Sequence, residues 1–140
     1  MVIVLDTNVF REGVHPKGDP KVKEWLRQLP LEESTTTIIN VAEMRAGTAR
    51  MPYGRDRIHL ETFIERQIVE GYGDRLLPFD LTAAAVYAAD VAERERRGRQ
   101  VGALDVMIGA ICKVHGTAIA TRNVKDFEGI GLQIVNPWEL

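Results

Sequence analysis

The chain has 140 residues and a net charge of −2, and 45% of its residues are apolar while 27% are charged. These values are typical of a globular domain with its own core, so we expect one domain over residues 1–140. The charge balance excludes an overall basic surface that attracts nucleic acid through net charge alone. The single cysteine, Cys112, excludes an internal disulfide and a thiolate zinc site. The sequence shows neither a membrane-length apolar run nor a signal-peptide pattern, which predicts a cytoplasmic protein without membrane contact.

Strand-like and helix-like patterns alternate along the chain. Runs rich in β-branched and other apolar residues predict strands at 2–5, 34–39, 76–79, 117–121 and 132–135. Helical spacing or alanine-rich composition predicts helices at 9–13, 20–29, 41–50, 55–71, 81–97 and 103–115, and a short turn or helix at 123–127. This alternation is typical of an α/β domain, and it predicts a mainly parallel central sheet of about five strands with helices on both faces.

The first predicted strand ends at Asp6, and Thr7 and Asn8 follow directly. In parallel sheets, ligands bind outside the carboxyl ends of the strands. The predicted strand 117–121 ends at the same edge, so its turn lies beside Asp6 if the two strands are neighbours. Asp6 taken alone also fits an aspartate that only turns the chain after a strand.

Two further acids stand near predicted helix starts. Glu43 lies three residues after Asn40, and this spacing fits a capping box in which Asn40 caps the helix and Glu43 bonds back to its backbone. Asp105 has apolar neighbours in the predicted buried helix 103–115, where an unpaired carboxylate is costly. A cation would offset that cost, so a functional role is favoured for Asp105.

Asp6, Glu43 and Asp105 indicate a metal site more strongly together than any of them does alone. Mg²⁺ and Mn²⁺ take oxygen ligands, mostly carboxylates and water. Without a cation, repulsion between converging acids raises the pKa of one or more of them. With a cation, bound water becomes a better nucleophile and developing phosphate charge is stabilised. Asn123 and Asp126 follow the fourth predicted strand, and they fit equally a capped turn with a surface acid or the rim of the same site.

Four segments, in the same order, resemble the motifs of PIN-domain ribonucleases. They are VLDTNV at 4–9, NVAEMRAG at 40–47, ALDVMIGA at 103–110 and ATRNVKDF at 120–127. The resemblance extends to the VapC-type toxins of toxin–antitoxin pairs, including the FitB-like branch, which shares the closing VNPW at 135–138. It covers essentially the whole chain and implies a single PIN-like domain.

The resemblance implies a Mg²⁺- or Mn²⁺-dependent endoribonuclease that hydrolyses RNA and is held inactive by a partner antitoxin. It also implies a homodimer, and it is compatible with a larger toxin–antitoxin assembly. Asp6, Glu43 and Asp105 match the metal-binding acids of the family. Many PIN domains place a fourth acid where this chain has Asn123, and the nearest acid here is Asp126. The occupant of the fourth position, and with it a second metal ion, therefore stays open.

Several other residues have both a functional and a structural interpretation. Thr7 and Asn8 can hydrogen-bond the ligand carboxylates or a phosphate oxygen, or they can simply form the turn. Arg122 is a candidate phosphate contact, although an arginine beside an acid often only forms an ion pair. The basic cluster 94–99 fits an RNA contact or, as the default, a solvated helix end. The apolar stripe over 60–68 fits ordinary core or part of a groove for an antitoxin helix.

The alternative function is a catalytically inactive PIN-like binding module that acts through its protein partner. In that case the acids only stabilise the sheet edge or hold a structural ion. A receiver domain is disfavoured because it needs paired acids at the first strand end, and Asp6 stands between Leu5 and Thr7. A phosphatase with an aspartyl nucleophile would have an acid two residues after Asp6, where this chain has Asn8. Metal-dependent RNA cleavage that is lost in Asp6→Asn with folding intact would separate the nuclease from the binding module.

Overall fold

The structure, a computed structural model, describes residues 1–140 and contains a four-stranded parallel sheet with the order β2-β1-β3-β4. The strands are β1 Ile3–Leu5, β2 Ser34–Thr35, β3 Ala118–Ala120 and β4 Ile134–Val135. β1 and β3 are the two central strands, and they pair in register from Ile3 with Ala118 to Leu5 with Ala120. The predicted parallel α/β fold is confirmed, and so is the expectation that the first strand and the strand before residue 121 end side by side.

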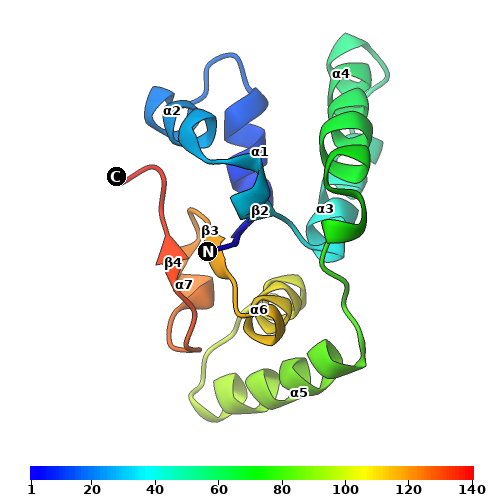
Figure 1. The fold of residues 1–140 in the computed structure, drawn as a ribbon. Coiled ribbons are helices and arrows are strands. Elements are labelled where there is room, and N and C mark those ends of the chain that lie inside the picture. Colours follow the sequence, from blue (N-terminus) through cyan, green and yellow to red (C-terminus); the bar gives the residue numbers. More distant parts are fainter.

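Helices cover both faces of the sheet, as the sequence predicts (Figure 1). They are α1 Thr7–Val14, α2 Pro20–Gln28, α3 Ile38–Ala49, α4 Arg55–Phe63, α5 Leu81–Arg96, α6 Ala103–His115 and α7 Val124–Phe127. Short 3₁₀ turns lie at η1 Leu31–Glu33 and η3 Gly73–Arg75, and α4 continues as a π-helical segment, η2 Ile64–Glu70. None of these helices combines the length and the apolar character needed to cross a membrane.

The core has two halves, one on each face of the sheet. Leu5 and Ala120 face a cluster formed with α1, α2, α3 and η2, whereas Val4 and Ile119 face a smaller cluster formed with α6 and α7. Successive residues of a strand point to opposite faces, so burial of both faces requires a continuous apolar run of this kind. α5 packs on α6 and forms an outer layer on the second face.

The predicted strands 34–39 and 132–135 are longer than β2 and β4, and the predicted strand 76–79 does not form. The segment 34–39 is a strand only over Ser34–Thr35, because Thr37 instead caps α3 by accepting a hydrogen bond from the backbone N–H of Asn40. The segment 76–79 does not form a fifth strand; it makes a single parallel bridge between Leu77 and Thr37. Threonine favours strands but is also a good helix cap, and here the start of α3 decides between the two.

Candidate active site

Asp6 is fixed at the carboxyl end of β1, where it also caps α1. Its side chain is only 3% exposed. Oδ1 accepts hydrogen bonds from the backbone N–H of Thr7 and from Nδ2 of Asn40, both at 2.9 Å. Oδ2 accepts from Oγ1 of Thr121 at 2.7 Å and more weakly from Nδ2 of Asn8 at 3.4 Å. These donors from three separate segments hold the carboxylate in one orientation and compensate its removal from water.

The sequence predicted that Asn40 caps the helix, but in the structure its side chain hydrogen-bonds Asp6 instead. It lies inside α3 and is fully buried. Oγ1 of Thr37 donates to its Oδ1 at 2.7 Å, and this contact directs its Nδ2 toward Asp6 and Thr7. The predicted capping box is therefore wrong, since the side chain of Asn40 is used by a carboxylate that stands 34 residues earlier. Glu43 is free to face the site.

Glu43 points from α3 toward Asp6. Oγ1 of Thr7 donates to its Oε1 at 3.3 Å, while the same hydroxyl accepts from Asn40. Burial raises the pKa of Glu43 and the negative charge of Asp6 raises it further, whereas the hydrogen bond from Thr7 and the charge of Arg11 act in the opposite direction. The structure thus brings Glu43 into electrostatic contact with Asp6.

Asp105 enters the same site from the first turn of α6, where its side chain is half-buried. Burial, a hydrogen bond with the carboxyl group of Asp126 and the charges of Asp6, Asp126 and Glu43 raise the pKa of Asp105 to about 7. No lysine or arginine forms an ion pair with any of these four acids. The acids therefore have no direct ion-pair partner, and the positive charges of Arg11 near Glu43 and of Arg94 near Asp105 and Asp126 act on them only at longer range.

The donor set fits a hard divalent cation, with one geometric condition. No three His, Cys, Asp or Glu side chains are close enough together to ligate one ion directly in this structure. Mg²⁺ commonly binds through one or two carboxylates and keeps several water molecules. An ion at this site would therefore contact some of the acids through water or after side-chain rotation.

The turn after β3 places the remaining predicted residues around this site. Asn8 accepts a hydrogen bond from the backbone N–H of Arg122 at 3.3 Å and so ties the turn to α1. The guanidinium of Arg122 lies 5.2 Å from the ring of Trp138 and is exposed. Asn123 is exposed and makes no side-chain capping contact, whereas Asp126 approaches Asp105.

Some residues that shape the site have no recognisable signal in the sequence. Thr121 and Asn40 hold Asp6, although both stand in segments that have ordinary strand and helix interpretations. Arg11 forms no side-chain hydrogen bond or ion pair, and its Nη2 lies 2.8 Å from the position that a Cβ on Gly47 would occupy. Gly47 thus leaves room for a free guanidinium close to Glu43.

A groove of about 740 Å³ opens next to Arg11, between α1, α3 and α4. Its apolar lining includes Phe10, Val14, Met44, Leu60, Phe63 and Ile64. The apolar stripe 60–68 is therefore divided, because Leu60 and Phe63 line the groove while Ile68 is fully buried in the core.

Comparison with known proteins agrees with this architecture. A sequence profile described as PIN domain matches residues 3–131. The VapC ribonuclease Y4jK of Sinorhizobium fredii is 38% identical over 138 residues, which cover 99% of both chains. Toxin FitB of Neisseria gonorrhoeae is 35% identical over 137 residues, covering 98% of this chain and 99% of FitB. The crystal structure of FitAcB from Neisseria gonorrhoeae superposes with a TM-score of 0.92 at 35% identity, covering 99% of this chain and 100% of that chain.

Proposed function

This chain belongs to the PIN-domain family and is related to the VapC and FitB toxins, and we propose that it is a Mg²⁺- or Mn²⁺-dependent endoribonuclease acting as the toxin of a toxin–antitoxin pair. The observation that carries the proposal is the group of acids without an ion-pair partner that gathers around Asp6, at the carboxyl end of β1. Such a group is costly without a cation, and it lies where parallel sheets bind ligands.

Asp6 and Asp105 would hold the metal, directly or through water. The cation would supply positive charge that activates a bound water and stabilises the phosphate. Asn40 and Thr121 fix the orientation of Asp6, so this ligand needs no rearrangement. Glu43 would orient the attacking water and take its proton, which suits a carboxylate whose pKa is raised. The water oxygen then bonds to phosphorus while the bond from phosphorus to the leaving RNA oxygen breaks, and the leaving oxygen takes a proton from solvent.

Asp126 is our choice for the fourth acidic position. It contacts Asp105, while Asn123 is exposed at the start of α7. Asn123 stays available for a substrate contact. The free guanidinium of Arg11 acts on Glu43, and the exposed guanidinium of Arg122 lies over Trp138 in the turn after β3; both are suited to bind RNA phosphates.

The direct test is cleavage of RNA by the purified chain with Mg²⁺, with Mn²⁺ and with a chelator. We expect cleavage only with metal, and a loss of about 10³-fold in Asp6→Asn and in Asp105→Asn, because metal positioning contributes several kcal/mol to such reactions. The matched control is Asp74→Asn, an exposed acid outside the site. Cleavage that persists in Asp105→Asn, or that continues at the same rate when the chelator is added, contradicts the proposal. A folded chain that binds its partner but never cleaves RNA supports the inactive binding module.

The groove beside Arg11 is our proposed site for an antitoxin segment. It has an apolar floor, and the charged and imidazole groups in its lining are Arg11, His15, Lys17 and His59 with a single acid, Asp56. An amphipathic segment with acidic flanks would complement it, and it would bring the antitoxin next to Glu43. Leu60→Asp should weaken antitoxin binding by about 100-fold, since it places a carboxylate on the apolar floor against the apolar face of the bound segment, and should leave RNA cleavage unchanged. Equal affinity of Leu60→Asp and wild type, measured by calorimetry, excludes this groove.

We also propose that the chain is a homodimer, as expected for this family. Light scattering of the isolated chain after size exclusion measures this directly, and a monomer at all concentrations contradicts it.

A further inference from the structure

α7 is a four-residue helix whose carbonyl groups are bound from outside the helix. Nη1 of Arg94 donates to the carbonyl of Asp126 at 2.9 Å. Nη1 of Arg99 donates to the carbonyl of Glu128 at 3.1 Å, and Nη2 of Arg99 donates to the carbonyl of Lys125. A helix this short cannot pair its own last carbonyls, so these two arginines provide the partners that its C-terminal end lacks.

Arg94 is buried, which the default interpretation of a solvated helix end did not foresee. It is 4% exposed, and its Nε and Nη2 have no hydrogen-bond partner. Burial of a guanidinium with only part of its donors paired is costly. An apolar residue of similar size would pack at this position without that cost. The burial of Arg94 therefore points to a role for its hydrogen bond to α7.

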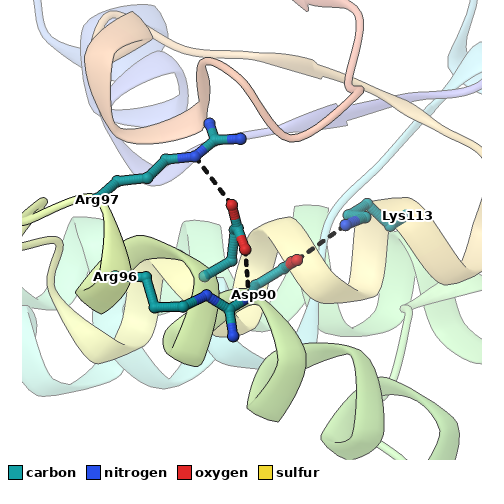
Figure 2. A network of polar contacts seen from close by, with 5 residues as sticks. Asp90, Arg96, Arg97 and Lys113 are labelled. Atoms are coloured by element: carbon teal, nitrogen blue, oxygen red, sulfur yellow. Dashed lines mark hydrogen bonds and ion pairs between the residues drawn. The ribbon is translucent and has the colours of Figure 1, made fainter.

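The neighbouring charges explain why Arg94 turns toward α7. On α5, Glu93 is already paired with Arg96 and Arg97 (Figure 2). Oδ1 of Asp90 is bound by Nζ of Lys113 from α6 at 2.9 Å. Arg94 forms an ion pair with neither acid, although the charges of Asp90, Asp126 and Asp105 favour its cation. Its one hydrogen bond reaches across to the backbone of Asp126, whose carboxyl group interacts with Asp105.

We propose that Arg94 is a positioning residue of the active site: together with Arg99 it clamps α7 so that the carboxyl group of Asp126 is held against Asp105. This inference rests on the proposed metal-dependent function. Phe127, which is fully buried, fixes the other side of α7, so the helix is held between a core residue and two arginines. The last turn of α5 thereby becomes part of the support of the metal site.

The test compares Arg94→Met, which removes the donors and the charge, with Arg94→Lys, which keeps the charge. Arg96→Met is the matched control, because Arg96 lies on the same helix end, is exposed and pairs only with Glu93. We expect Arg94→Met to weaken Mn²⁺ binding, measured by calorimetry on the metal-free chain, by about 10-fold, with a similar fall in kcat and little change in KM for RNA. Arg94→Lys should recover part of the affinity, and Arg96→Met should match wild type.

A double variant asks whether Arg94 acts through Asp126. If it does, adding Arg94→Met to Asp126→Asn should change the Mn²⁺ affinity by less than about twofold, because the group being positioned is already gone. If the loss of Mn²⁺ affinity in the double variant equals the product of the two single losses, the proposal is overturned. Wild-type Mn²⁺ affinity and kcat in a folded Arg94→Met chain also overturn it.

Two further measurements keep the outcome clear. Hydrogen exchange over residues 124–128 should be about 10-fold faster in Arg94→Met than in wild type, with or without metal, because α7 loses a brace. If Arg94→Met does not fold, Arg99→Met removes two of the carbonyl contacts from a less buried position, and unchanged exchange and Mn²⁺ affinity there overturn the clamp. A wild-type chain that neither binds Mn²⁺ nor cleaves RNA instead refutes the proposed function and, with it, the role of the clamp.

Discussion

Asp6 and Asp105 meet at one edge of the sheet but are compensated in opposite ways. Asp6 is almost fully buried and accepts hydrogen bonds from the backbone of Thr7 and from three side chains. Asp105 is half-buried, and its neighbour is another acid, Asp126. The fold itself therefore replaces water around Asp6, whereas Asp105 depends on a proton or a cation.

This difference separates two kinds of acid among the proposed metal ligands. The first, Asp6, is hydrogen-bonded at the end of the sheet and contributes to the stability of the fold. The second carries an electrostatic cost that the fold does not remove, as is common for groups at functional sites. Substitution of the two carboxylates by amides should abolish the same activity and yet change stability with opposite signs.

The largest stability effect is expected for Asp6→Asn. The amide leaves one of the two oxygen positions without an acceptor, so donors such as Nδ2 of Asn40 or Oγ1 of Thr121 lose a charged partner. We expect a loss of about 2–3 kcal/mol in the free energy of unfolding, measured by urea titration. Asp74→Asn, an exposed acid, should stay within about 0.5 kcal/mol of wild type. Unchanged stability of Asp6→Asn would mean that the hydrogen bonds around Asp6 do not hold the fold.

Asp105→Asn should stabilise the metal-free chain at alkaline pH. The pKa of Asp105 is raised to about 7 in the folded state, so the folded chain binds its proton more tightly than the unfolded chain does. This contribution to stability is complete below the ordinary pKa of aspartate and is lost as the pH rises through about 7. At about pH 8 the variant should exceed wild type by about 1–2 kcal/mol, a value reduced for the partial exposure of the site.

The pH series makes the result specific for Asp105. The gain should shrink toward about pH 5, where the folded wild-type chain keeps the proton. Saturating Mn²⁺ should reverse the order of stability, because the cation binds only the native wild-type site. If Asp105→Asn is less stable than wild type at every pH, the carboxylate of Asp105 must be stabilised by the fold itself, as that of Asp6 is.

The sequence predicted best those features that depend on local signals. α6 has the expected bounds, 103–115, because a glycine with positive φ, Gly116, ends it and an apolar composition buries it. The parallel sheet with helices on both faces follows from the alternating pattern. The candidate acids were predicted because each follows a predicted strand or stands near a predicted helix start, and each also lies inside a short motif that resembles the family.

The contacts around those acids were not predictable from local signals. Asn40 and Thr121 hydrogen-bond to Asp6 from 34 and 115 residues away in the sequence. From its sequence position alone, Asn40 fits a helix cap and Thr121 fits an ordinary strand end, so neither indicates this contact. Arg94 and its neighbour Arg96 lie in the same basic helix end, yet one is buried and the other exposed. What distinguishes them is the hydrogen bond that Arg94 alone makes to the backbone of α7.

The smallest effect tests whether Asn8 belongs to the fixed surroundings of Asp6 or contacts the substrate. Its Nδ2 lies 3.4 Å from both Asp6 and Thr121, and its Oδ1 accepts from the backbone of Arg122 at 3.3 Å. Because both ends of the amide are occupied by long and therefore weak hydrogen bonds, Asn8→Ala should cost only about 0.5–1 kcal/mol of stability. KM for RNA should stay within about twofold of wild type, since no donor is left for a phosphate. A KM that rises about 10-fold at unchanged stability would move Asn8 from the support of Asp6 to the RNA-binding surface.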